Sequence, residues 1–319
     1  MSMIEDHSFF AKLDKADDLL KQGQYGEALA VLENIFTRYP EEEPVLLRLA
    51  WASWDSGDKE RSVAYWEMLL DRELQRKIFT GFAYDELVRI YKQENQIEKL
   101  AAVCEKAVAV QPDDAALLLE LGNARLQAGK AMDACRIYEK LVQLEDDNPD
   151  YHCRLGEALF AAGCPAESEA AYRQAGKIDP ELVDRYYFRI ADLFARNKRH
   201  LEAIRLLEAC IDTNPVQPLY YCCLGDELAA LGRIQEAWAV YETAVTYDPS
   251  GAGAYYNRLG NTLMKEKIFD RAAGAFQKAI EREPLAPFYG NLASAYEAMG
   301  QFQLAEDALM RAGAVRKIC

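Results

Sequence analysis

Residues 221–249 read YCCLGDELAALGRIQEAWAVYETAVTYDP, and this stretch decides the fold. Its first half carries apolar residues at the i, i+3, i+4, i+7 spacing of one helical stripe: Tyr221, Leu224, Gly225 and Leu228. After Gly232, a second stripe follows: Ala237, Tyr241 and Ala244. The spacing predicts two helices joined by a short turn, in which small residues permit close approach and the Tyr241 ring fills the gap.

The same spacing recurs along the 319 residues at steps of 33 to 38. Small or apolar residues mark the predicted helix crossings: Ala16, Ala50, Val88, Gly122, Gly156, Ala191, Gly225, Gly260 and Ala293. A period of this length predicts a helical solenoid, which grows in one dimension. We expect one solenoid over 9–316, with short tails at 1–8 and 317–319. Its nine units fall near 9–42, 43–80, 81–114, 115–148, 149–183, 184–217, 218–252, 253–285 and 286–316.

Turn and stop signals support this division. Seven residues after each crossing comes a predicted left-handed turn residue: Gly23, Gly57, Gly129, Gly163, Gly232 and Gly300, with Asn95, Lys198 and Lys267 in the other units. Prolines that end second helices are Pro112, Pro180, Pro215, Pro249 and Pro284. The segment 71–81 is lengthened, which predicts a longer second helix or an inserted loop.

With these residues the chain resembles the tetratricopeptide repeat family. The family pattern is met by Tyr221, Leu224, Gly225, Ala237, Tyr241 and Pro249, and again by Tyr256, Leu259, Gly260, Ala272, Phe276 and Pro284. The first two units depart from it, since Ala16 and Ala50 replace glycine, Ser62 replaces alanine and Leu74 replaces proline. The resemblance implies an all-α, right-handed superhelical solenoid of antiparallel helix pairs, whose first helices line a concave groove that binds a peptide or a partner helix.

We expect the partner-binding residues on the exposed side of the first helices. They are Arg48, Trp51, Trp54, Arg89, Asn123, Arg154, Phe188, Arg189, Asn257, Arg258, Asn261 and Asn291. The alternative is that Arg154 with Glu157, and Arg189 with Asp192, are i, i+3 pairs on a solvated helix face. Packing at the lengthened junction is likewise an alternative role for Trp51 and Trp54.

Composition excludes several classes of partner. The net charge of −15 argues against nucleic acid and against an anionic membrane surface. No apolar run approaches the roughly 20 residues that span a bilayer, and the start lacks the pattern of a signal peptide. We therefore expect a cytoplasmic protein that binds a protein or peptide.

The cysteines and histidines give little support for a catalytic, redox or metal site. Cys104 and Cys210 occupy predicted packing positions, whereas Cys153, Cys222 and Cys223 fall on the predicted groove face, where a redox or metal role stays open. The three histidines are His7, His152 and His200. Ser56 to Lys59 matches a bare S-x-x-K string that we interpret as a turn. Part of the ligand spacing of a calcium loop is matched by Asp146, Asn148, Asp150 and Glu157. Tyr151, however, stands where that loop requires glycine.

The sequence thus predicts a non-enzymatic scaffold or adaptor without catalytic residues, metal or cofactor. A peptide-responsive sensor is one alternative. A chaperone tail receptor is another, because Asn261 and Asn291 resemble part of the carboxylate clamp of such receptors, although Asn257 stands where the clamp lysine is required. Finally, Leu304, Leu309, Val315 and Ile318 are expected to be partly exposed, which predicts self-association through the last unit.

Overall fold

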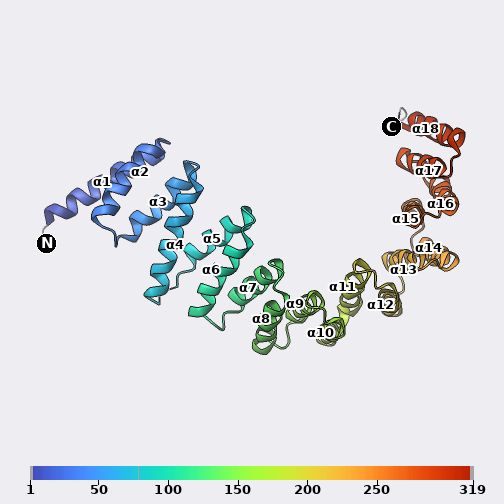
Figure 1. Cartoon of the computed structure of the whole chain (residues 1–319), viewed down its shortest axis with the longest axis horizontal. Helices are drawn as coiled ribbons and strands as arrows, with labels where there is room; N and C mark the ends of the chain where they lie inside the picture. Colours follow the sequence, from blue (N-terminus) through green and yellow to red (C-terminus); the bar gives the residue numbers. More distant parts are fainter. Residues whose placement is uncertain (1–2, 78, 317–319) are drawn as a thin grey trace. The chain divides into compact units, whose positions relative to one another are not determined.

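The computed structural model describes residues 3–77 and 79–316, and in that part every regular element is a helix. Figure 1 labels the α-helices in chain order. Their bounds are α1 Met3–Lys21, α2 Tyr25–Arg38, α3 Glu43–Asp55, α4 Lys59–Gln75, α5 Phe82–Gln93, α6 Ile97–Val110, α7 Ala115–Gln127, α8 Ala131–Leu144, α9 Pro149–Ala161, α10 Pro165–Ile178, α11 Val183–Arg196, α12 His200–Thr213, α13 Pro218–Ala230, α14 Ile234–Tyr247, α15 Ala252–Lys265, α16 Phe269–Arg282, α17 Ala286–Ala298 and α18 Phe302–Arg316. The predicted all-α class is confirmed.

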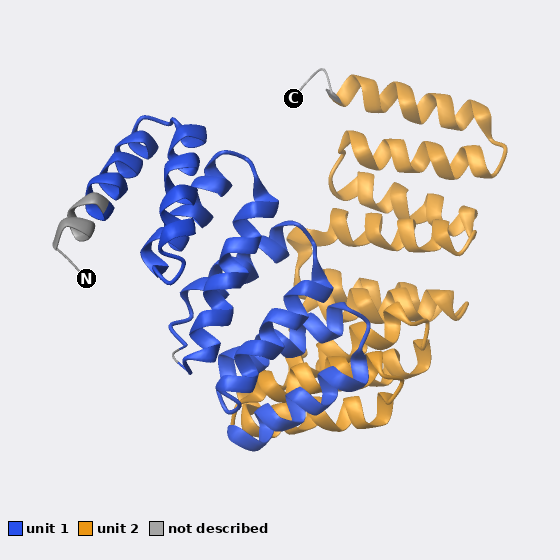
Figure 2. Ribbon diagram, turned by 60° about the vertical axis from the view of Figure 1, so that its left-hand side comes forward, with its two compact units in different colours: residues 1–146 blue, residues 147–319 orange. Residues whose placement is uncertain are grey.

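The helices form two compact units, which Figure 2 colours separately. Unit 1 comprises residues 1–146 and unit 2 comprises residues 147–319. Within each unit, each odd-numbered helix packs against the helix that follows it, and the second helix of a pair packs against the first helix of the next. This is the predicted solenoid of antiparallel helix pairs. That one continuous solenoid runs through both units stays a prediction.

The helix pairs occupy the predicted repeats closely. Only the first differs at its start, because α1 begins at Met3 rather than near position 9. In the second pair, α4 is 17 residues long where α2, α6 and α8 have 14, and a loop precedes α5. Both proposed causes of the lengthened junction therefore apply.

Glycine at a helix crossing makes room for an aromatic ring. A Cβ atom added to Gly225 would lie 2.5 Å from the ring of Tyr241, and one added to Gly260 would lie 2.4 Å from Phe276. Gly122 and Gly156 face Tyr138 and Tyr172 in the same way, at 2.5 and 2.7 Å. These rings are fully buried. The predicted role of the crossing glycines is confirmed.

In the second helix pair, other residues occupy the crossing. Ala50 takes the crossing position in the second pair, and Ser62 takes the position of the family's alanine. The buried Ser62 hydroxyl donates a hydrogen bond of 2.8 Å to the carbonyl of Ala50, just as Ser168 donates to Gly156 at 2.7 Å. Because the hydroxyl is satisfied at the crossing itself, serine replaces alanine there without leaving a buried polar group unpaired.

All nine predicted turn residues adopt the left-handed conformation, with φ between 52° and 88°. In three of the nine turns the residue is not glycine: Asn95, Lys198 and Lys267. The five prolines each stand two residues beyond the end of a second helix, as predicted.

Candidate functional site

The candidate site is the exposed side of the first helices of the pairs, which we call the first-helix face. In unit 2 these helices are α9, α11, α13, α15 and α17, and contacts join α9 to α11, α13 to α15 and α15 to α17. In unit 1 they are α1, α3, α5 and α7. Side chains on this face can therefore interact from one helix pair to the next.

In unit 2, two arginines on this face bind carboxylates of the preceding first helix. Arg189 of α11 donates to Glu157 of α9 at 2.7 Å, and Arg258 of α15 bonds Asp226 of α13 at 2.7 and 2.9 Å. Burial alone would lower the pKa of Arg258, but the Asp226 carboxylate more than offsets this and raises it. These arginines are charged and tie consecutive pairs together.

Asp226 is the centre of the larger of these networks. It also accepts hydrogen bonds from the hydroxyls of Tyr241 at 2.7 Å and Thr262 at 2.5 Å. The crossing ring of Tyr241 thus extends from the core to the first-helix face. Arg258 donates in addition to the Cys223 sulfur at 3.2 Å.

A small hollow lies beside this network, with a volume of about 110 Å³. Its lining residues come mainly from α11, α13 and α15: Phe188, Ala191, Asp192, Ala195, Leu207, Cys223, Asp226, Glu227 and Arg258. Each carboxylate of the lining has a cationic or imidazole partner. Asp192 pairs with Arg196 at 2.7 Å, and Glu227 lies 2.8 Å from Nδ1 of His200.

The predicted pairing of Arg189 with Asp192 is wrong. Arg189 turns instead toward Glu157, because the neighbouring first helix brings a carboxylate closer than the i+3 position of its own helix does. The Arg154–Glu157 pair does form, at 3.4 Å.

The asparagines divide into two groups. Asn291 of α17 donates to Asn257 of α15 at 2.8 Å, which links two consecutive first helices. Asn123 of α7 accepts from the hydroxyl of Tyr138 at 2.8 Å. Asn261 is exposed, and its side chain forms no hydrogen bond within the described part of the chain. Of the two clamp-like asparagines, Asn261 and Asn291, only Asn261 therefore has a free amide in the described part of the chain.

In unit 1 the two predicted tryptophans lie partly inside the structure. Trp51 packs edge-on against the buried Trp66, with ring centroids 5.3 Å apart. The guanidinium of Arg89 lies 4.8 Å and the ammonium of Lys59 lies 5.4 Å from the Trp54 ring. Packing and cation–π contacts thus engage both indoles.

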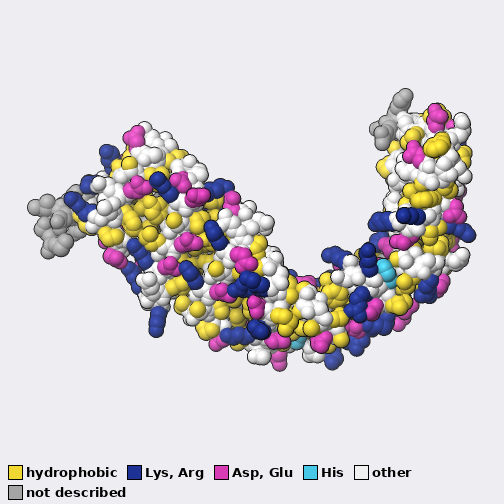
Figure 3. Space-filling view, viewed as in Figure 1, with side chains coloured by type: hydrophobic (Ala, Val, Ile, Leu, Met, Phe, Trp, Pro, Cys, Tyr) yellow, Lys and Arg dark blue, Asp and Glu magenta, His cyan; other side chains and the backbone are white. Residues whose placement is uncertain are grey.

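The two predicted site arginines of unit 1 also form ion pairs. Arg48 bonds both oxygens of Asp17, at 2.6 and 2.9 Å. Arg89 bonds Glu86 of its own helix at 2.7 and 2.9 Å. Consistent with this, positive and negative side chains lie next to one another on the visible surface of each unit in Figure 3.

The placement of Cys153 and Cys222 on the groove face is wrong. Both are buried in the core of unit 2, and burial raises the pKa of Cys153 to about 11 and that of Cys222 to about 12. Their thiols are therefore protonated near neutral pH. Only Cys223 is half-buried at the face. Cys104 and Cys210 are buried, as predicted.

The motif interpretations hold where the structure describes them. Gly57 has φ 88°, and Asp58 caps α4 by accepting from the N–H of Arg61, so the S-x-x-K string is a turn. Asn148 accepts from the N–H of Asp150 at 3.1 Å and caps α9. In the described residues, no cluster of three or more His, Cys, Asp or Glu is arranged to hold a metal ion. None of the described helices is long and apolar enough to cross a membrane.

Sequence reasoning missed the contacts between pairs, and with them Glu227, His200, Thr262 and the hydroxyl of Tyr241. A signal for them exists in the spacing. Glu157 and Arg189, like Asp226 and Arg258, are 32 positions apart, and Asp17 and Arg48 are 31 apart. An acid just after one crossing and an arginine just before the next therefore predict such a bridge.

Comparison with known proteins agrees with the helix pairs. Models described as tetratricopeptide repeat match residues 19–76, residues 119–183 and 153–218, and residues 286–312, and one described as TPR repeat matches 225–266. The BBSome complex member BBS4 homolog of Drosophila melanogaster is 23% identical over 263 residues, which are 76% of this chain and 52% of that protein.

One further relative and one solved structure are also similar to part of this chain. DnaJ homolog subfamily C member 7 of Homo sapiens is 24% identical over 227 residues, which are 68% of this chain and 46% of that protein. The chain spans about half the length of these two relatives. The crystal structure of MamA protein matches 55% of this chain and 94% of its own, with 20% identity and a TM-score of 0.43. Because the repeat models cover most of the sequence and coincide with its helix pairs, the chain belongs to the tetratricopeptide repeat family.

Proposed function

We propose that this chain is a non-enzymatic cytoplasmic scaffold that binds a peptide or helical segment of a partner protein on the first-helix face of unit 2. Repeat proteins of this kind use extended surfaces for binding. The observation that carries the proposal is the hollow formed by α11, α13 and α15, with the aromatic ring of Phe188 in its lining.

The contacts available there define the partner segment. Arg189 and Arg258 are already neutralised by Glu157 and Asp226, so an acidic segment would have to displace these carboxylates. Phe188 and Asn261 are neutral side chains and form no ion pair. We therefore assign affinity to an apolar side chain of the partner on Phe188 and to hydrogen bonds between its backbone and the amide of Asn261.

Selection of displayed random peptides on the full chain tests this proposal. The selected peptides should bind Phe188→Ala and Asn261→Ala at least about tenfold more weakly, a loss typical of a central interface contact. The matched control is Phe10→Ala, because Phe10 is a 57% exposed phenylalanine on α1 of unit 1. Equal affinity for the wild type, Phe188→Ala and Asn261→Ala would overturn the proposal. Asn261 is exposed, so its substitution separates lost contact from lost stability.

The chaperone tail receptor is a weaker candidate. Asn291 donates a hydrogen bond to Asn257, which occupies one of the two clamp-like asparagines, and Asn257 stands where the clamp lysine is required. The names of relatives such as DnaJ homolog subfamily C member 7 support this candidate only by similarity.

Self-association through the last helix pair is a further part of the proposal. In α18, Phe302, Leu304, Leu309 and Met310 are 45 to 71% exposed. Val315 is half-buried, and Ile318 lies outside the described residues. We expect a molar mass that rises with protein concentration in light scattering. The variant Leu309→Glu should lower it, and a constant monomer mass would contradict the proposal.

A further inference from the structure

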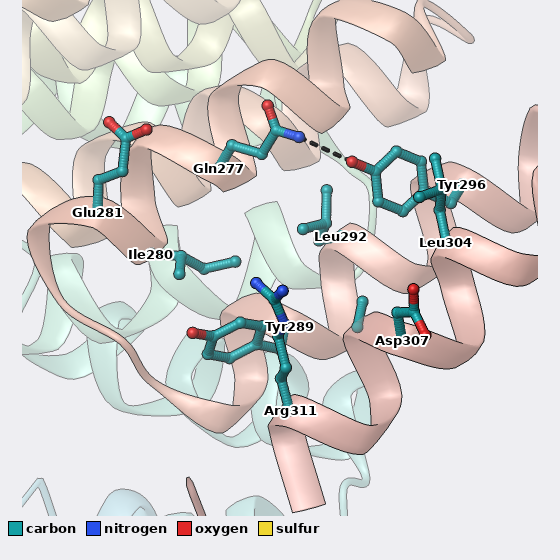
Figure 4. A pocket seen from close by; sticks show the side chains of 10 residues that line it. Gln277, Ile280, Glu281, Tyr289, Leu292, Tyr296, Leu304, Asp307 and Arg311 are labelled. Carbon is teal, nitrogen blue, oxygen red and sulfur yellow. Dashed lines mark hydrogen bonds between the residues drawn. The ribbon is translucent and has the colours of Figure 1, made fainter. Parts of the chain in front are cut away.

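A second recess of unit 2 lies among α16, α17 and α18 (Figure 4). Its volume is about 340 Å³, which is within the range of ligand sites, roughly 300–1,000 Å³. Aromatic and apolar side chains form most of its lining: Ile280, Tyr289, Leu292, Tyr296, Leu304 and Ala308. Three charged groups, Glu281, Asp307 and Arg311, and the amide of Gln277 complete it. We call this recess the α16–α18 pocket.

The equivalent position one repeat earlier shows what such a recess can hold. There the ammonium of Lys278 lies 5.0 Å from the Trp238 ring and 5.2 Å from the Tyr256 ring. The same ammonium donates to the Glu242 carboxylate at 2.8 Å. An indole, a phenol and a carboxylate thus surround one cation of the chain itself.

The α16–α18 pocket keeps the cation but lacks two of these groups. Ala273 stands 35 positions after Trp238, and Gln277 stands 35 after Glu242, the same step that relates the crossings Gly225 and Gly260. Tyr289 replaces Tyr256 and Arg311 replaces Lys278, each at the step of 33 that relates Gly260 and Ala293. The indole and the carboxylate are therefore missing, while the phenol and the cation are retained.

The remaining groups leave the guanidinium of Arg311 uncompensated. Gln277 is neutral, and its amide donates to the hydroxyl of Tyr296 at 2.7 Å. Within the described part of the chain, Arg311 forms no ion pair within 4.0 Å. Glu281, Asp307 and Arg311 are all exposed, and neither carboxylate lies within ion-pair distance of the guanidinium. In Figure 4 the side chain of Arg311 is directed toward the space that the other labelled residues enclose.

We propose that the α16–α18 pocket binds a partner protein segment that presents an aromatic side chain next to a carboxylate. The ring occupies the apolar space between Tyr289, Tyr296 and Leu292, and the carboxylate pairs with Arg311. Such a ligand supplies the two groups that Trp238 and Glu242 supply internally one repeat earlier. The planar guanidinium is suited to a carboxylate, which it can bind through two parallel hydrogen bonds. This site is independent of the first-helix face, so either can fail alone.

Small probes test the chemistry on the full chain by ligand-observed NMR titration. N-acetyltryptophan carries the ring and the carboxylate, N-acetyltryptophanamide lacks the charge, and tryptophanamide carries a cation instead. N-acetyltryptophan should bind at least about tenfold more tightly than both others, as expected for a hydrogen bond to a charged group. The peptide acetyl-Trp-Glu-amide, compared with N-acetyltryptophan, distinguishes a side-chain carboxylate from a chain terminus.

Three variants decide whether binding occurs in this pocket. Arg311→Gln removes the cation and Gln277→Glu supplies an internal carboxylate, so each should weaken N-acetyltryptophan at least about tenfold. Arg282→Gln is the matched control, because Arg282 is exposed on α16 and does not line the pocket. The proposal is overturned if Arg311→Gln binds as well as Arg282→Gln. It is equally overturned if tryptophanamide is the preferred probe or if none of the probes binds.

Discussion

At the scale of single residues, the size of the crossing residue and the size of the side chain 16 positions later are linked. Glycine at 122, 156, 225 and 260 faces a tyrosine or phenylalanine. Ala191 occupies one crossing, and Leu207 stands 16 positions later. Val88 occupies another crossing, and Cys104 stands 16 positions later. The combined volume is thus similar in these six units, as close packing requires, whereas Ala50 in the second unit is followed 16 positions later by the larger, buried Trp66.

This complementarity predicts the effect of one methyl group. Gly225→Ala places a Cβ 2.5 Å from Tyr241 and should lower the free energy of unfolding by about 1–3 kcal/mol, measured by urea denaturation. Gly274→Ala is the control, since a Cβ there meets no atom within 4 Å, and it should stabilise by about 0.5–1 kcal/mol. The double variant Gly225→Ala with Tyr241→Leu should recover part of the loss. Equal effects of the two single variants would refute the packing argument.

The sequence predicted crossing residues and turns well, because local spacing and backbone conformation determine them. It did not predict the partners of Arg189 and Arg258. Those contacts join one helix pair to the next, so the pattern within a pair does not reveal them, whereas the spacing of 32 positions between the acid and the arginine does. For the same reason, Cys153 and Cys222 were placed on the surface although both are buried.

At the scale of helices and turns, two lysines occupy positions that favour glycine. Lys198 and Lys267 have φ of 57° and 61°. For residues with a Cβ, the left-handed conformation costs about 1–2 kcal/mol, which glycine avoids. Lys198→Gly and Lys267→Gly should each raise the free energy of unfolding by up to about 1 kcal/mol, and Gly232→Lys should lower it. Destabilisation by both lysine substitutions in urea titrations would contradict this prediction.

The start of α11 should make unit 2 sensitive to acid through Asp184. This buried carboxylate accepts hydrogen bonds from Tyr220 at 2.8 Å and Asn214 at 2.9 Å. Burial alone would raise the pKa of Asp184, but these bonds and one from the N–H of Arg185 lower it below its usual value. A depressed pKa stabilises the fold above the unfolded-state value of about 3.9 and loses that contribution as the pH falls through the folded value.

Urea midpoints measured between about pH 6 and pH 3 test this coupling. Wild type should exceed Asp184→Asn in stability at the upper end, and the difference should shrink as the pH falls. Asp212→Asn, which changes an exposed aspartate, should follow the wild type across the range. A difference between wild type and Asp184→Asn that is independent of pH would rule out this role.

At the scale of the whole molecule, the repeats provide two surfaces with different chemistry. On the first-helix face, carboxylates satisfy the arginines, and a small hollow with Phe188 in its lining remains. In the α16–α18 pocket, the guanidinium of Arg311 forms no ion pair within the described part of the chain. A scaffold with these two surfaces can hold an apolar segment and an acidic aromatic segment at once.

The central claim is that the first-helix face of unit 2 receives the partner segment. It is tested most directly by site-specific photo-crosslinking with a selected peptide. A benzoylphenylalanine placed at Asn261 should crosslink to the peptide, and one placed at Thr243, a half-exposed residue of the second helix α14, should not. Mass spectrometry identifies the joined residues. A peptide that crosslinks from position 243 and not from position 261 would contradict the account.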